Sequence, residues 1–185
     1  MRDKRPTSKT CSSHKTFIYL FSWCSLISLS PALLASAITI DGKLDEPEWQ
    51  SARVWDQYVE SIPFSLAEPK HTQRVLILED EKGMYFGFIS DQARETVRTN
   101  QHQRDNERAN SDKVGVSIDF DGDGLTGYGF SVSAGGSITD TIYRNENQGN
   151  TDWDADWESA TFVDEEAWFA EVFIPWTVAP MKAVT

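Results

Sequence analysis

The chain has 185 residues, a formal net charge of −12 at pH 7 and only two cysteines. A domain this acidic repels nucleic acid and anionic lipid, so the charge argues against both as partners and suits neutral ligands or cations. Both cysteines precede residue 38, so the rest of the chain has no disulfide, no thiol nucleophile and no cysteine-bound metal.

The first 37 residues have the pattern of a signal peptide. Basic residues come first, an apolar run follows over residues 17–34, and Ala35 and Ala37 form an A-x-A cleavage site. Serines and a proline interrupt the run, which disfavours the alternative of a transmembrane anchor. We therefore expect export to the periplasm, the outer membrane or the extracellular space. The mature domain is then residues 38–185, with no further apolar stretch long enough to span a membrane.

Strand patterns dominate the mature domain. Residues 75–78 and 84–89 are apolar runs around a polar, glycine-ended loop, which predicts a hairpin. Alternation of apolar with polar or small side chains predicts further strands over 113–120 and 128–134. A weaker strand is expected over 137–143, and a strong one over 167–174 that Pro175 ends.

The remaining segments complete the predicted fold class. Residues 45–52 suit a short helix, and residues 91–112 suit a long surface loop that contains at most a helical turn. Many short strands with regular turns predict an all-β protein, an antiparallel, jelly-roll-like β-sandwich. The strand over 167–174 is apolar on nearly both faces and should be interior. Because the residues after Pro180 offer no partner strand, we also expect the domain to continue into a C-terminal region beyond this sequence.

Three segments carry a family resemblance: ITIDGKLDEPEWQSA from residue 38, VGVSIDFDGDGLTGYGFSVSAGGSITD from residue 114, and DWESATFVDEEAWFAEVFIPW from residue 156. Together they resemble the family 9 carbohydrate-binding modules over most of residues 38–176. The resemblance implies a β-sandwich that binds oligo- or polysaccharide, often with calcium. Within the motifs, Trp49 and Trp168 are expected to be core residues.

The segment DFDGDG offers oxygen ligands for calcium. Asp119, Asp121 and Asp123 stand at alternate positions, and further oxygens could come from Asp140, Asp152 or Asp154. A complete EF-hand loop is excluded, because its twelfth position is Phe130. The alternative is a polar hairpin turn in which the aspartates accept hydrogen bonds from local backbone N–H groups.

The acidic segment TDWDADWESA, residues 151–160, contains two tryptophans. A sugar ring stacks its C–H face on an aromatic ring, and its hydroxyls require polar partners. We expect Trp153 to face a ligand and Trp157 to lean toward the core, beside the start of the next strand. The candidate sugar-contacting residues are Trp153, Trp157, Tyr143, Arg144, Asn145, the nearby Asn147, and Trp55 as a second platform.

No catalytic signature is present, and His71 and His102 are too far apart in sequence to suggest a histidine metal site. The favoured hypothesis is an exported, non-catalytic carbohydrate-binding module. One alternative is an N-terminal structural domain of a larger outer-membrane protein without a sugar site. The other is an accessory module of a glycoside hydrolase in carbohydrate catabolism, with its catalytic domain outside this sequence.

Overall fold

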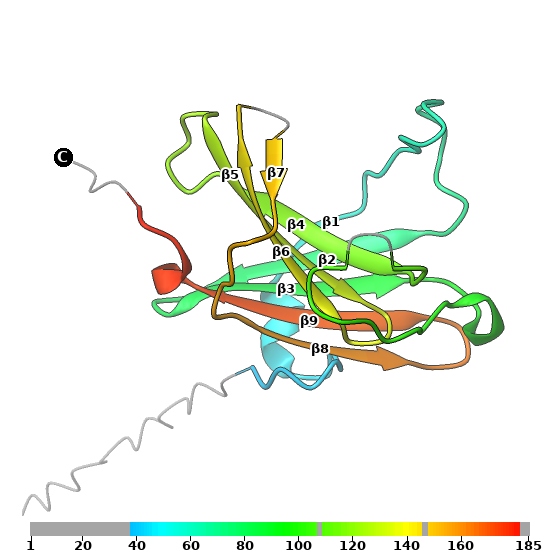
Figure 1. Ribbon diagram of the computed structural model, residues 1–185. Helices are drawn as coiled ribbons and strands as arrows, with labels where there is room; N and C mark the ends of the chain where they lie inside the picture. The colour runs from blue at the N-terminus through cyan, green and yellow to red at the C-terminus, as the bar shows by residue number, and fades with distance from the viewer. Residues whose placement is uncertain (1–37, 107–108, 146–147, 182–185) are drawn as a thin grey trace, which may run out of the picture. The chain divides into compact units, whose positions relative to one another are not determined.

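The computed structural model describes residues 38–106, 109–145 and 148–181, so the predicted signal peptide lies outside the described residues. The described chain forms two antiparallel sheets (Figure 1). The first sheet has the order β1-β2-β3-β9-β8 and the second β4-β5-β6-β7. The strands are β1 Arg53–Trp55, β2 Gln73–Glu79, β3 Gly83–Ser90, β4 Lys113–Ile118, β5 Thr126–Ser133, β6 Ile138–Arg144, β7 Gln148–Asn150, β8 Glu158–Val163 and β9 Trp168–Pro175.

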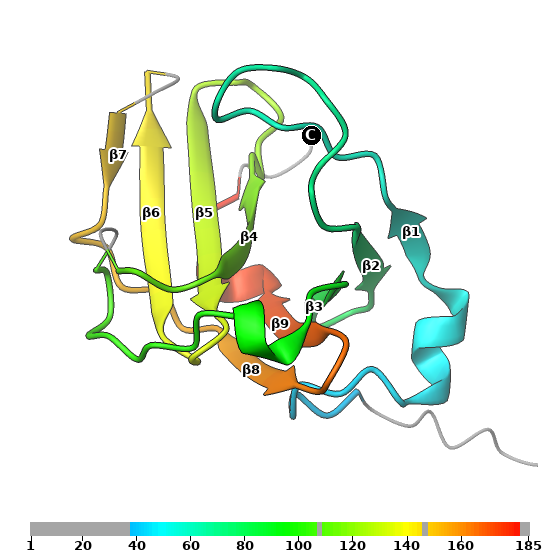
Figure 2. The ribbon, with the colours of Figure 1, turned by 90° about the vertical axis from the view of Figure 1, so that its right-hand side faces the viewer.

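The two sheets pack as layers, which Figure 2 shows from the side. This confirms the predicted all-β sandwich. Phe130 and Val132 of β5 are almost fully buried, as are Trp168 and Ile174 of β9. β9 lies between β3 and β8, so its predicted interior position is correct. Both of these partner strands belong to the described chain.

Short 3-10 turns replace the expected helical segments. Proline at the first turn begins η1, Pro47–Ser51, where the sequence predicts a short helix. The long loop after β3 contains η2, Arg94–Thr96, as predicted, and η3, Trp176–Val178, follows β9. The sequence analysis missed β1 and β7, because each has three residues, all of them exposed, and therefore shows no apolar alternation.

The N-terminal segment packs on the outer face of the five-stranded sheet. Trp49 is 5% exposed, as expected of a core residue. It packs over Gly87 of β3, however, and is not part of the cluster of buried residues that includes Phe130 and Trp168. A Cβ at Gly87 would stand 2.5 Å from a methyl carbon of Leu44, so glycine is required for this close approach. Trp49 donates a hydrogen bond of 3.1 Å from Nε1 to Glu171, a fully buried carboxylate of β9.

Candidate functional site

A cleft of about 570 Å³ lies beside the ends of β6 and β7. This volume is within the range of ligand-binding pockets. Its lining residues are Ile142, Arg144, Gln148, Gly149, Asn150, Asp152 and Trp153. Strand alternation places Ile142 and Arg144 on the face of β6 that also carries the core residues, and their partners Asn150 and Gln148 extend that face onto β7. The cleft is therefore built on the inner face of the four-stranded sheet, at its β7 edge.

Trp153 forms the aromatic wall of this cleft. Its ring meets Tyr128 edge-on at a centroid distance of 5.2 Å and Phe130 at 6.0 Å. The side chain is half-buried, so one part rests on the core and the rest is available to a ligand. The sequence predicted a more exposed ring. Aromatic contacts of this kind fix the orientation of the indole before any ligand arrives.

Polar groups surround the tryptophan. The Arg144 side chain is exposed and makes no hydrogen bond or ion pair with any other described residue. Asn145 donates to Gln148 Oε1 at 3.4 Å, and the Asp152 backbone N–H donates to Asn150 Oδ1 at 2.6 Å. The cleft thus combines a guanidinium, amides and a carboxylate with one aromatic ring. The sequence analysis missed Gln148, Asn150 and Asp152 as cleft residues, although their polar character beside Trp153 was a usable signal.

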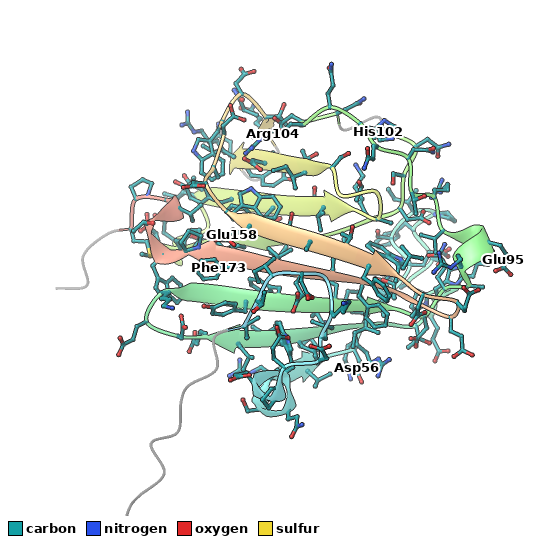
Figure 3. All side chains as sticks on the ribbon, turned by 90° about the horizontal axis from the view of Figure 1, so that it is seen from below. Asp56, Glu95, His102, Arg104, Glu158 and Phe173 are labelled. Atoms are coloured by element: carbon teal, nitrogen blue, oxygen red, sulfur yellow. The ribbon has the colours of Figure 1, made fainter. Side chains whose placement is uncertain are left out.

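A buried carboxylate holds the loop that carries Trp153. Asp140 of β6 is fully buried and accepts hydrogen bonds from Trp157 Nε1 at 2.7 Å and from the Ala155 N–H at 2.7 Å. It also forms an ion pair with Arg104, which donates to the Ala155 carbonyl at 3.0 Å and pairs with the exposed Asp154. Figure 3 shows Arg104 on the same side of the domain as Glu158, the first residue of β8. The loop is therefore preorganised.

Two predicted ligand residues are corrected by this cluster. Trp157 points inward, as the sequence analysis argued for one of the two rings, and it is only 8% exposed, so it is removed from the sugar-contacting set. Asp140 is not a partner of Asp119 in a calcium site, because its two oxygens are occupied by Trp157, Ala155 and Arg104.

The other predicted aromatic residues, Tyr143 and Trp55, do not line the cleft. Tyr143 pairs with Gly127 and Gly149 and therefore lies on the opposite face of β6 from Arg144. Trp55 is 53% exposed on β1, in the other sheet, where its Nε1 donates to the Gln57 carbonyl at 3.2 Å. Asn147 lies outside the described residues.

The segment DFDGDG forms a self-capped turn. Asp119 accepts hydrogen bonds from the N–H groups of Asp121, Gly122 and Gly124, and Asp123 accepts one from Leu125. Both glycines have positive φ, which the turn requires. Within the described ranges, no group of three or more His, Cys, Asp or Glu residues is arranged to hold a metal ion. This arrangement is the polar turn that stood as the alternative to calcium.

The calcium hypothesis stays a prediction and has a direct test. If calcium binds at Asp119, Asp121 and Asp123, the melting temperature should be higher with calcium than with chelator. Mass action gives about 2.7 kcal/mol at a hundredfold excess over Kd. Thermal unfolding followed by circular dichroism measures this difference. Asp121→Ala should abolish the difference, and identical wild-type curves with calcium and chelator would reject the site.

Comparison with known proteins identifies solved structures with a similar fold. No protein-family model matches the sequence, and a search of curated proteins found no match. Two solved structures of a family 9 carbohydrate-binding module from Caldicellulosiruptor kristjanssonii are similar. The complex with glucose has a TM-score of 0.54 and 13% identity, covering 80% of this chain and 70% of that one. The complex with cellotriose has a TM-score of 0.53 and 13% identity, covering 78% and 66%.

A candidate carbohydrate-binding protein from Bacteroides uniformis is also similar, with a TM-score of 0.53 and 13% identity over 71% of this chain and 63% of that one. The domain therefore has the fold of the family 9 carbohydrate-binding modules, which confirms the resemblance of the sequence motifs at the level of the fold. Among the described residues, no helix is long and apolar enough to cross a membrane.

Proposed function

We propose that this domain is a non-catalytic carbohydrate-binding module of an exported protein, and that it holds an oligo- or polysaccharide in the cleft beside β6 and β7. The observation that carries the proposal is the composition of the cleft. A half-buried tryptophan stands beside side-chain amides and an arginine whose side chain has no partner among the described residues, in a hollow of about 570 Å³. The fold, shared with modules solved in complex with glucose and cellotriose, supports the same reading.

The roles of the groups follow from the chemistry of sugars. Trp153 presents an apolar surface to the C–H face of a pyranose ring, and the hydroxyls around that ring require both donors and acceptors. Arg144 supplies donors only, whereas Gln148 and Asn150 supply both kinds of group. A neutral sugar suits the cleft, because Asp152 and the acidic loop would repel an anionic one.

The first test is the replacement of Trp153 by alanine. We expect Trp153→Ala to weaken oligosaccharide binding at least tenfold, because the stacking surface is lost. It should cost only about 1–2 kcal/mol of stability, since the ring is half-buried. Isothermal titration against a panel of oligosaccharides that includes cellotriose measures the affinity, and circular dichroism at the same temperature checks folding.

Two further variants sharpen this test. Arg144→Ala should also weaken binding, and it should leave stability within about 0.5 kcal/mol because the side chain is exposed. Trp55→Ala is the matched control, since it removes an exposed tryptophan that does not line the cleft. If Trp55→Ala abolishes binding while Trp153→Ala does not, the site lies at β1. If the wild-type domain binds no member of the panel, the reading as a structural domain of a larger protein replaces this one.

A further inference from the structure

A second groove lies on the outer face of the four-stranded sheet. Two adjoining hollows of about 360 and 340 Å³ share Ser117 and Tyr143 in their linings. Together they follow β5 from Gly127 to Ser131, about 13 Å of strand. The cleft around Trp153 is on the inner face of this sheet, so the two hollowed regions lie on opposite faces of β6 and meet only at the β7 edge.

The Tyr143 ring lies flat on this outer face. A Cβ built on Gly127 of β5 would have the Tyr143 Cβ as its nearest neighbour, at 3.7 Å. A Cβ built on Gly129, two residues further along β5, would instead be 2.8 Å from the ring atom Cε2. The ring axis therefore runs along the strands. A Cβ at Gly149 of β7 would be 3.3 Å from Cε1, the opposite edge of the ring. With one edge over β5 and the other over β7, one face of the ring lies against the sheet and the other faces out.

The polar groups nearest this ring are hydroxyls, while one charged side chain lines each hollow, Asp119 in the first and Lys113 in the second. The hydroxyls of Ser117, Ser131 and Thr139 make no hydrogen bond with other described residues, and neither does the phenol of Tyr143. A flat aromatic face with free hydroxyls beside it matches a ligand that has an apolar ring face and many hydroxyls of its own. Gly129 and Gly149 leave room for the ring to lie on the sheet, because a Cβ at either position would stand 2.8 or 3.3 Å from a ring atom.

We propose that this groove is a second carbohydrate site, in which Tyr143 stacks on a pyranose ring of an oligosaccharide and the surrounding serine and threonine hydroxyls bind its hydroxyls. The occupant is a neutral sugar chain rather than a charged ligand, because the ring and the hydroxyls nearest it carry no charge, and the two charged side chains in the linings, Lys113 and Asp119, have opposite signs. The groove also adjoins the proposed cleft at Gly149, which lines the cleft and contacts the Tyr143 ring. One long polysaccharide, or two separate chains, can then engage both faces of the domain.

Aromatic NMR resonances give a test that needs no destabilising change. The Tyr143 ring signals are assigned by comparison with Tyr143→Phe, and cellohexaose, xylohexaose and mannohexaose are titrated into the domain. We expect a saturable shift of the Tyr143 signals with at least one hexasaccharide, and the shift should persist in Trp153→Ala. That background separates this proposal from the proposed function, because it removes the stacking residue of the cleft.

Three variants on the Trp153→Ala background measure the contribution of the ring. Tyr143→Ala should weaken the remaining binding about tenfold, whereas Tyr143→Phe keeps the stacking face and should change it by less than about threefold. Gly129→Ala retains the tyrosine but places a Cβ 2.8 Å from its ring, so it should displace the ring and also weaken binding. The proposal is overturned if the Tyr143 signals do not move with any hexasaccharide, or if Tyr143→Ala and Gly129→Ala bind as tightly as their parent.

Discussion

Replacing Asp140 with alanine is expected to lower the free energy of unfolding by about 3–5 kcal/mol, because the change removes the only fully buried partner of Arg104 in the described chain and leaves it with Asp105 and the exposed Asp154. The Trp157 Nε1–H and the Ala155 N–H lose their acceptors in the same step. Sugar binding in the cleft should weaken as well, since the loop that carries Trp153 is no longer fixed. Urea unfolding measures the stability, and titration at a temperature where the variant is folded measures the affinity.

Asp154→Ala is the matched control for this prediction. Asp154 pairs with the same arginine at 3.0 Å, but its side chain is 73% exposed, and exposed ion pairs contribute about 0–1 kcal/mol. Asp140→Asn keeps one acceptor oxygen and should fall between the two, at about 1–3 kcal/mol. A loss below about 1 kcal/mol for Asp140→Ala would show that the buried cluster does not organise the loop.

The sequence predicted the strands whose apolar periodicity the core requires. β9 is an example, because alternation identifies its buried face and Pro175 ends it. β7 escaped prediction because it lies at the edge of its sheet, where exposed side chains leave no periodic pattern. The cleft depends on this strand, so its amide residues were missed together with it.

Neighbouring positions in the sequence were mistaken for neighbours in the site. Tyr143 and Arg144 are adjacent at the end of the strand expected over 137–143, and both were predicted to contact the same sugar. They are the last two residues of β6, so their side chains leave opposite faces of the sheet. Asp140 was predicted to supply an oxygen ligand to a calcium site. Its position between Ile138 and Ile142 at strand spacing was the available signal that it points inward, where only a partner such as Arg104 makes a charge tolerable.

The second large effect concerns the fully buried Glu171, which anchors the N-terminal segment. Its Oε2 accepts hydrogen bonds from the N–H groups of Asp41 at 2.9 Å and Gly42 at 2.8 Å, and its Oε1 accepts one from Trp49 Nε1. A glutamine at this position has one acceptor oxygen and a donor amide, so at least one buried N–H would face another donor. We expect Glu171→Gln to cost about 1–3 kcal/mol for each hydrogen bond lost, measured by urea unfolding.

Glu171 should also make the stability depend on pH. Burial raises the pKa of Glu171 from 4.5 to about 7. The negative charge of Glu46 also raises this pKa, whereas the three hydrogen bonds lower it. Between pH 4.5 and 7 the native state therefore binds more protons than the unfolded state. The free energy of unfolding should fall as pH rises through this window, with a slope of at most about 1.4 kcal/mol per pH unit.

Comparing wild type with Glu171→Gln isolates this contribution. Asp80 and Asp112 have a lowered pKa, so their contributions are lost only as the pH falls below their ordinary value of 3.8, outside the window. Urea unfolding of both proteins at several pH values from 4.5 to 7.5 gives the two slopes. The wild-type stability should decline relative to that of the variant up to about pH 7 and then run parallel to it. A constant difference across the range would mean that Glu171 is ionised throughout, held in that form by its three N–H donors.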